Sequence, residues 1–556
     1  MASTLLPYVV LVVAPLTWVA VRVARHVSPW LRVVLATLLL VLIVRGLPLE
    51  GVGYPVLKRL NLLLSAAMVM ALLLLHAGAP WWTRAREYLR FLIALGVASV
   101  VVYLNFFAFH GGRTFMHRHD VAHYYLGSKY FHEVGYGDLY VAMIRAESDA
   151  YGGAVKAREV RDLATNQMLS SDAVLAASDS IKRRFSTDRW TAFVEDVRYF
   201  RDAMGPRYPE IFRDHGYNPT PVWTLMGGTI ANRVPAGSAE GIGLLTLLDP
   251  VIEIAVFAAI GSAFGIETML TSLVYFCVLY GAMFDWIGGA YLRYVSFAAI
   301  VGAACCVERR RHVAAGALLA VATMLRIFPV LFLGGPVLRG LGEWIRTRRI
   351  PHETLRLVGG FAATVALLFL TSGLTDDGFA PWVEFHRNTR AHMASVSANI
   401  LGATNWPTYL SGIDVRAPGG LEEFLAWRKS VFAVQLLVLF PVTVLILALV
   451  VQRRDDLEAM ALSSVLVLTS VNIPAYYYTF MVLLVVAFRD RPDRVAWLFA
   501  LEAVLYAFDL FEDHEVLIYL YKSALLFAFF AAVFAGEARD GVGVDAEVAA
   551  ARVRSS

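Results

Sequence analysis

The chain has 556 residues, of which 58% are apolar and 17% are charged. An average soluble domain has roughly 25% charged residues and about 45–50% apolar ones, so the composition excludes an ordinary soluble protein. The net charge of +4 is small, and we expect no nucleic-acid partner. The three cysteines lie in apolar runs, which argues against a disulfide framework and against a thiolate metal site.

Apolar runs of about 18–22 residues recur along the chain, and this is the length that crosses a bilayer. They predict an all-α integral membrane protein, a polytopic helical bundle with about fourteen or fifteen membrane segments. Four of these runs precede the first long polar interval, at residues 5–23, 31–47, 62–77 and 91–109.

Basic residues gather in short loops, for example at 309–311, 346–349 and 453–454. Loops of this kind stay in the cytoplasm, so we expect the two long polar intervals to face the exterior. The expected organisation is N-terminal transmembrane helices (1–110), a first outer loop (111–240), transmembrane helices that include a broken-helix hairpin (241–372), a second outer loop (373–430), C-terminal transmembrane helices (431–536) and a disordered cytoplasmic tail (537–556).

The apolar segment 313–338 has basic residues at both ends and is interrupted by Arg326-Ile-Phe-Pro329. Because a proline kinks a helix, we expect two short helices that turn back inside the membrane or at its outer face. An arginine at such a break is costly unless it meets an anion. Inside the first outer loop, apolar residues at helical spacing between 158 and 212 predict two or three amphipathic helices.

The stretch His117-Arg-His-Asp-Val-Ala-His-Tyr-Tyr125 follows the fourth apolar run and opens the first outer loop. A carboxylate shielded from bulk water can take a proton from an attacking hydroxyl, so Asp120 is our candidate general base. A structural interpretation also stays open, in which Asp120 caps the start of a helix over 121–134.

A metal site is a second alternative for the same stretch. His117, His119, Asp120 and His123 carry the ligand types that suit zinc or manganese. We expect no metal and no cofactor in the reaction, because arginines can stabilise a departing phosphate. No Gly-rich phosphate loop precedes a helix, which favours a lipid-phosphate donor over a nucleotide sugar.

Two motifs in the first outer loop carry a family resemblance: Asp120-x3-Tyr124-Tyr125 and Gly135-x-Gly-Asp138-Leu-Tyr140. They resemble the first outer loop of the GT-C glycosyltransferases, and most of all the family 87 polyprenyl-phosphomannose-dependent mannosyltransferases. Further similar stretches are Tyr217-Asn-Pro-Thr-Pro221, Arg326-Ile-Phe-Pro329, Trp382-x2-Phe385-x6-His392-x6-Asn399-x2-Gly402 and, more weakly, Tyr476-Tyr-Tyr478. Asn218 and Arg326 replace a proline and a lysine of the family pattern.

The resemblance implies a role for each matched position. Asp120 is the base, and His392 lies across the cleft from it. Arg326 holds the lipid phosphate, because a guanidinium binds phosphate oxygens with two donors. Further candidates are Arg293, Arg387 and Arg390 for the donor phosphate, His119, His123, Tyr124, Tyr125, Trp382 and Tyr477 for the sugar or acceptor, and Asp285 as the reserve base.

The function expected from this resemblance is transfer of one sugar from a polyprenyl-phosphate donor to a lipid or glycan acceptor. The first candidate for the sugar is mannose, and we expect inversion at the anomeric carbon. The alanine, valine and arginine bias points to a bacterial inner membrane and a periplasmic site. Two alternatives stay open: an arabinosyl- or metal-dependent oligosaccharyl-type transferase, and a transporter or flippase for a lipid-linked sugar.

Overall fold

The computed structural model describes residues 51–79, 85–110, 114–394, 399–403, 405 and 411–555. It is 75% helical with almost no sheet, which confirms the predicted all-α class. Within the described residues, five helices are long and apolar enough to cross a membrane: Tyr54–His76, Ala239–Phe264, His352–Ser372, Gly420–Arg453 and Glu515–Gly536. The protein is therefore a polytopic membrane protein. The runs predicted at 5–23 and 31–47 lie outside the described residues.

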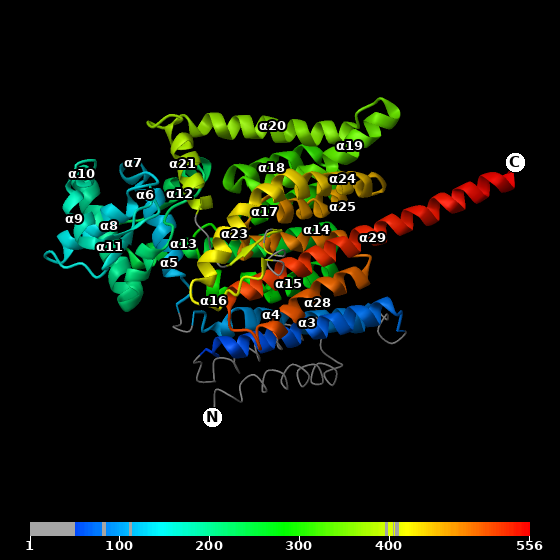
Figure 1. Ribbon diagram of the computed structural model, residues 1–556, viewed down its shortest axis with the longest axis horizontal. Helices are drawn as coiled ribbons and strands as arrows, with labels where there is room; N and C mark the ends of the chain where they lie inside the picture. Colours follow the sequence, from blue (N-terminus) through cyan, green and yellow to red (C-terminus); the bar gives the residue numbers. More distant parts are fainter. Residues whose placement is uncertain are drawn as a thin grey trace, which may run out of the picture.

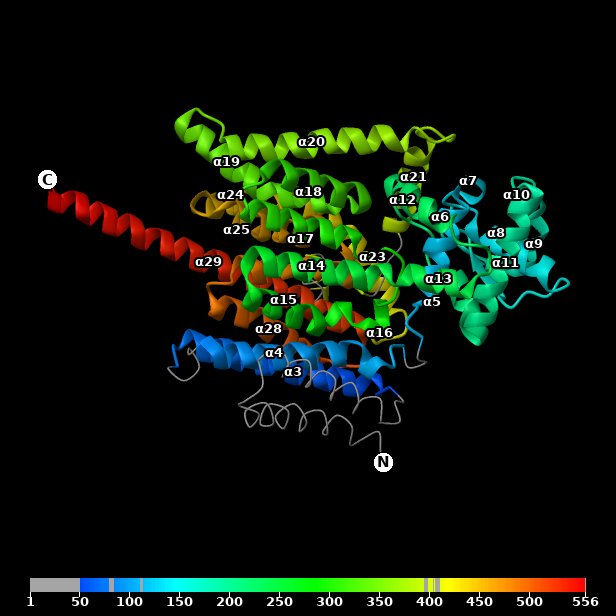
Figure 2. The same ribbon diagram turned by 180° about the vertical axis from the view of Figure 1, so that it is seen from behind.

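Long helices run side by side through one bundle, and a compact insertion, residues 114–238, lies at one end of it (Figures 1 and 2). The bundle contains α3 (Tyr54–His76), α4 (Ala85–Tyr103), α13 (Ala239–Thr246), α14 (Leu248–Phe264), α15 (Ile266–Val278), α17 (Val295–Glu308), α18 (His312–Arg326), α19 (Gly334–Thr347), α20 (His352–Ser372), α23 (Gly420–Val434), α24 (Phe440–Val450), α25 (Asp456–Leu462), α26 (Ser464–Ser470), α27 (Val482–Ala487), α28 (Pro492–Phe508) and α29 (Glu515–Ser555). Helix α29 includes residues for which the sequence predicts a disordered tail.

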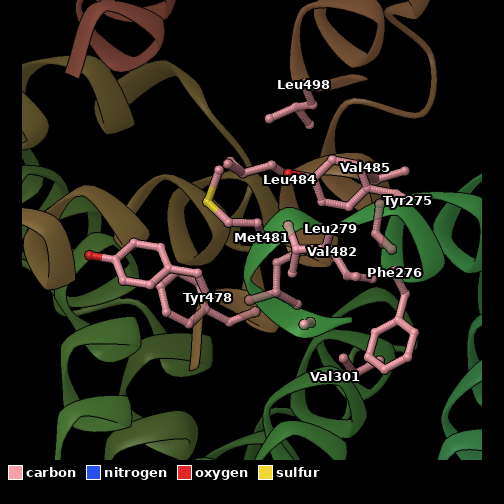
Figure 3. Packing of buried hydrophobic residues seen from close by; sticks show 14 of the residues in the cluster. Tyr275, Phe276, Leu279, Val301, Tyr478, Met481, Val482, Leu484, Val485 and Leu498 are labelled. Atoms are coloured by element: carbon pink, nitrogen blue, oxygen red, sulfur yellow. The ribbon is translucent and has the colours of Figure 1, made fainter. Parts of the chain in front are cut away.

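The centre of the bundle is packed where α15, α17, α27 and α28 meet (Figure 3). Phe276, Val301, Val482 and Leu498 are almost completely buried there. In a membrane such contacts stabilise helix association through close packing, since lipid tails are as apolar as the side chains. A tightly packed centre gives the residues at the end of the bundle a rigid support.

Helices α18 and α20 approach each other through two glycines. A Cβ atom at Gly316 would overlap the Leu357 carbonyl oxygen, and one at Gly360 would overlap the Val313 carbonyl oxygen. Small residues at these positions let two backbones come into contact, as is common between transmembrane helices. The contact fixes α18, whose last residue is Arg326.

Helix α18 stops at Ile327, which has a φ of 55°, and the chain continues through η5 (Phe328–Leu333) into α19. His312, the first residue of α18, and Arg339, within α19, both approach the Asp456 carboxylate, with His312 Nδ1 at 3.8 Å and Arg339 Nη1 at 2.8 Å. Helices α18 and α19 therefore form a hairpin whose turn lies toward the insertion.

Helix α4 ends earlier than the apolar run 91–109 predicts, because its last residue is Tyr103. The next residues form η1 (Asn105–Phe107), and Asn105 and Phe106 have positive φ angles. The Asn105 side chain accepts a hydrogen bond from Val52 N at 3.1 Å and donates one to Asp285 Oδ2 at 3.0 Å. These long-range bonds stabilise a local conformation that apolar periodicity cannot indicate.

The insertion has a hydrophobic core of its own. Its elements are α5 (Arg118–Val121), η2 (Ala122–Leu126), α6 (Gly127–Lys129), α7 (Phe131–Val134), α8 (Leu139–Ala150), the antiparallel strands β1 (Glu159–Arg161) and β2 (Met168–Ser170), α9 (Ser171–Ala177), α10 (Asp179–Lys182), α11 (Thr187–Met204), η3 (Gly205–Arg213) and α12 (Pro221–Ala231). Helix α11 buries Trp190, Phe193, Val197 and Phe200 on one face, as its spacing predicts. The buried pair between Lys129 Nζ and Asp196 Oδ2, 2.9 Å apart, joins α6 to α11.

Short elements close the end of the bundle beneath the insertion. They are η4 (Tyr280–Ala282), α16 (Phe284–Ile287), α21 (Ala380–Ala394), the two-stranded pair β3 (Ile400–Leu401) and β4 (Ile473–Pro474), and η8 (Ala475–Met481). Within the long span Gly420–Arg453, η6 (Gln435–Leu439) joins α23 to α24, and η7 (Val451–Arg453) follows α24 at the opposite end of the bundle. Arg489 and Arg491 pair there with Glu308 and Glu458, both at 3.2 Å. The basic loops thus gather at the end away from the insertion.

Candidate active site at the junction of insertion and bundle

A cavity of about 740 Å³ lies between the insertion and the end of the bundle. The insertion contributes α5, η2 and the segment after η3, while the bundle contributes α16 and the residues just before α17 and η8. Asp120, Asp285 and Arg293 all line this cavity. Two carboxylates and a guanidinium therefore face one polar cavity.

Asp120 forms an ion pair with Arg293, which stands just before α17. The two side chains are only 18% and 10% exposed, so water screens their attraction weakly. The Arg293 guanidinium also lies over the Tyr476 ring, 4.9 Å from its centre. Arg293 is thus held by an anion and by an aromatic face at the wall of the cavity.

His117, and not Asp120, caps helix α5. Its Nδ1 atom accepts a hydrogen bond from the backbone N–H of Asp120 at 3.3 Å. Burial, together with the neighbouring His110 and Arg293, lowers the pKa of His117 well below its usual value. The imidazole is therefore neutral, and the 3.4 Å approach of its Nδ1 to the Asp120 carboxylate is not an ion pair. The interpretation of Asp120 as an N-cap is wrong, because Asp120 lies inside the helix.

Asp285 lies in α16, where the cavity meets the bundle. Burial raises its pKa to about 7, although the hydrogen bond from Asn105 Nδ2 lowers it in part. Its Oδ1 atom is buried without a hydrogen-bond partner in the described part of the chain. A carboxyl group with this pKa exchanges its proton near neutral pH, which is a property required of a general acid or base.

His119, His123 and Asp214 form a second polar cluster on the cavity wall. His119 Nε2 lies 2.9 Å from Asp214 Oδ2, and the two imidazole rings are 4.9 Å apart between centres. His123 Nε2 contacts the Tyr140 hydroxyl at 2.7 Å. Burial, and then the nearby His119, lower the pKa of His123 to about 4. Burial alone would raise the pKa of Asp214, but the hydrogen bond from His119 and the nearby His123 outweigh it and lower the pKa.

Arg326 lies at the turn of the α18–α19 hairpin, beside two tyrosines. Its guanidinium is 5.6 Å from the centre of the Tyr124 ring and 5.3 Å from that of Tyr477. Its Nη2 atom lies 3.4 Å from the Tyr124 hydroxyl. Tyr124 lines the cavity and Arg326 does not. Tyr124 thus stands between the Arg326 charge and the cavity.

The comparison with known proteins decides the class of the protein. The model of glycosyltransferase family 87 matches residues 239–475. This part of the chain is similar to glycosyltransferase family 87. The protein is therefore a membrane glycosyltransferase. No curated protein and no solved structure matches the chain.

The family 87 match includes Asp285, Arg293 and Arg326, and it ends just before Tyr476. Asp120 and the rest of the insertion precede it. The glycosyltransferase cavity thus has one wall inside the matched region and one wall outside it. The two walls are joined by the ion pair between Asp120 and Arg293.

Several residues predicted for the glycosyltransferase site lie away from the cavity lining. Tyr125 is fully buried in the insertion, where its hydroxyl bonds to Asp196 Oδ1 at 3.3 Å. Trp382 donates from Nε1 to Ser372 Oγ at 2.9 Å. Tyr477 packs beside Arg326 and Phe328.

The remaining predicted residues belong to α21. Arg387 and Arg390 are exposed there, and neither lines the cavity. The backbone of His392 lies in the same helix, but its side chain is outside the described part of the structure. The structure therefore groups six of the predicted residues around one cavity: Asp120, Arg293, Asp285, His119, His123 and Tyr124. Arg326 lies behind Tyr124 and does not line the cavity.

The sequence does not indicate that Asp214 contacts His119 or that Tyr140 contacts His123. Asp214 is 95 positions from His119, with which it pairs. Its one local signal is its place directly before His215 and the Tyr217-Asn-Pro-Thr-Pro221 segment. Spacing along the chain cannot reveal such a contact, because the fold of the insertion creates it.

Proposed function

We propose that this glycosyltransferase moves one hexose from a polyprenyl-phosphate donor to a lipid or glycan acceptor. The sugar that we propose first is mannose. The reaction inverts the anomeric carbon, and Asp120 acts as the general base. The observation that carries the proposal is the position of Asp120, a mostly buried carboxylate on the wall of a 740 Å³ cavity. A cavity of this size accommodates a sugar and the reacting end of an acceptor.

Arg293 has a double role in this proposal. Without donor it neutralises Asp120, and its buried Nε atom has no hydrogen-bond partner in the described residues. A donor phosphate would compete with the carboxylate for the guanidinium, since arginine binds phosphate oxygens with two donors. The carboxylate released in this way is free to accept the proton of the acceptor hydroxyl. Arg293 then stabilises the negative charge on the departing lipid phosphate.

Arg326 is the second phosphate candidate. Its distance from the lining means that Tyr124 must move, or that the phosphate must reach the turn of the α18–α19 hairpin from the membrane side. Arg387, Arg390 and His392 of α21, together with Trp382, remain proposed from the family resemblance alone. We propose a bacterial inner membrane as the location, with the cavity facing the periplasm, because the basic loops gather at the other end.

The reaction is tested with purified protein, a synthetic polyprenyl-phosphomannose and an extract of membrane acceptors. The variant Asp120→Asn removes the base without changing the size of the side chain. The matched control is Asp179→Asn, because Asp179 forms an exposed ion pair with Arg145 away from the cavity lining. We expect the Asp179→Asn protein to transfer mannose and the Asp120→Asn protein to bind donor without transfer.

Other outcomes separate the alternatives. Equal transfer by both variants would indicate that Asp285, and not Asp120, acts as the general base. Transfer of arabinose and not mannose would favour the arabinosyl-type enzyme. Movement of the intact lipid-linked sugar across a vesicle membrane, unaffected by Asp120→Asn, would identify a flippase. The anomeric configuration of the product, read by NMR, tests inversion directly.

A further inference from the structure

We propose that His119, His123 and Asp214 bind a divalent transition-metal ion, with Zn²⁺ as the preferred ion. This site is separate from the Asp120–Arg293 pair and does not depend on which sugar or donor the enzyme uses. Two imidazoles and a carboxylate are a ligand set found at zinc sites with three protein ligands, where a water or a substrate oxygen takes the fourth position.

The geometry places three ligand atoms around one point. One donor atom from each residue lies within 4.8 Å of the other two. Ligand atoms bound to one zinc ion at about 2.0–2.1 Å are roughly 3–4 Å apart, so small side-chain rotations suffice. All three residues line the cavity, which leaves the remaining coordination position accessible.

The charges around the cluster favour a cation at this place. No ion pair joins Asp214 to a lysine or arginine within the described residues, and its carboxylate meets imidazole and a backbone N–H. The Asp120 carboxylate differs from that of Asp214, because it already forms an ion pair with the Arg293 guanidinium. A metal ion at His117 and Asp120 would have to displace that charge.

The number of ligands distinguishes this cluster from other histidine–aspartate contacts. His132 with Asp377, His76 with Asp493, and His312 with Asp456 are contacts between one imidazole and one carboxylate. In the described part of the chain, only the His119 cluster gathers three such groups closely enough for one ion.

Outer contacts orient two of the three ligands. The Tyr140 hydroxyl contacts His123 Nε2 at 2.7 Å and orients the imidazole ring. The backbone N–H of His215 donates to Asp214 Oδ1 at 2.7 Å, and Oδ2 is the oxygen that faces His119. Hydrogen bonds of this kind fix ligand orientation and raise metal affinity.

Bound zinc would connect two segments that are distant in sequence. His119 and His123 belong to α5 and η2, whereas Asp214 directly follows η3. The ion would therefore hold the segment after η3 against the helix that carries Asp120, and would set the width of the cavity on that side.

The test uses full-length protein purified without a histidine tag, stripped with a chelator and then equilibrated with ZnCl₂. After removal of free metal, zinc per protein is measured by mass spectrometry, together with the unfolding temperature. The variant Asp214→Asn removes a ligand oxygen and keeps the side-chain size. The control Asp377→Asn alters the exposed His132 pair, whose Nδ1–Oδ2 distance is 2.6 Å.

We expect one zinc per wild-type and Asp377→Asn protein, with a higher unfolding temperature in its presence. The Asp214→Asn protein should bind zinc at least about 100-fold more weakly and show no thermal shift. Wild-type protein that retains no zinc, or Asp214→Asn protein that retains as much as wild type, overturns the proposal.

A second measurement needs no variant and covers the case in which Asp214→Asn does not fold. X-ray absorption of the zinc-loaded wild type should show two imidazoles among nitrogen and oxygen neighbours. A spectrum without imidazole scattering overturns the site. Neither measurement uses sugar transfer, so failure of the zinc site and failure of the proposed reaction are distinguishable.

Discussion

Arg293 and Asp120, which are 173 positions apart in the sequence, form the ion pair that connects the bundle to the insertion across the cavity wall. Arg293 lies within the family 87 match and Asp120 lies before it. The pair thus joins a region shared with the family to one that the family model does not match. The consequences of breaking it are measurable in both stability and transfer.

Arg293→Gln should lower kcat/KM for transfer by at least about 100-fold, because it removes the cation that we propose stabilises the leaving phosphate. It should also destabilise the protein, since it leaves the Asp120 carboxylate buried without its partner. The double variant Asp120→Asn/Arg293→Gln should recover stability and not transfer. Arg346→Gln, at the opposite end of the bundle, serves as the control. Full activity of Arg293→Gln would contradict the phosphate role.

Arg326→Lys should keep part of the activity, and Arg326→Gln should lose most of it through a higher KM for the donor. A lysine retains the charge at the turn of the α18–α19 hairpin but cannot bind phosphate with two donors. Initial rates against donor concentration separate KM from kcat. Unchanged donor KM in both variants would show that Arg326 serves the fold through Tyr124 and Tyr477 and does not meet the donor.

Asp285 should make stability depend on pH. Its folded-state pKa is about 7, above the ordinary value of 3.8, so the folded protein holds a proton that the unfolded chain releases between these two values. Stability should therefore fall as pH rises from about 4 to 7 and level off above 7. After allowance for partial exposure, we expect an effect of about 1–2 kcal/mol. Unfolding temperatures of Asp285→Asn at pH 5, 6, 7 and 8 should show a flatter profile than wild type; identical profiles would contradict the raised pKa.

Gly316→Ala should destabilise the bundle by about 1–3 kcal/mol, because the new Cβ atom would overlap the Leu357 carbonyl oxygen and force α18 from α20. Gly359→Ala is the matched control on α20, where nothing lies within 4 Å of the added atom. The control should be neutral or slightly stabilising, since alanine favours helix more than glycine does. Equal unfolding temperatures of the two variants in the same detergent would argue against close contact of the helices.

The sequence predicts the all-α membrane class and the amphipathic helix α11, because both depend on periodic apolar residues. It also predicts that Asp120, Arg293 and Asp285 are candidate functional residues at one end of the bundle. It cannot predict that Asp120 pairs with Arg293, or that His119 meets Asp214, since these contacts arise only when distant segments pack. For the same reason it places the end of α4 too late: the bonds of Asn105 to Val52 and Asp285 stop the helix at Tyr103.

The separation of 173 positions between the partners of the central ion pair also imposes an order of biosynthesis. A ribosome completes the insertion, with its own core, before it makes the helix that follows Arg293. Until then Asp120 has no bundle to cover it and stays hydrated. Its carboxylate loses water only when the insertion docks on the bundle, so the ion pair cannot form before the insertion is complete. Formation of this ion pair during translation would therefore report the docking step and not the synthesis of the insertion itself.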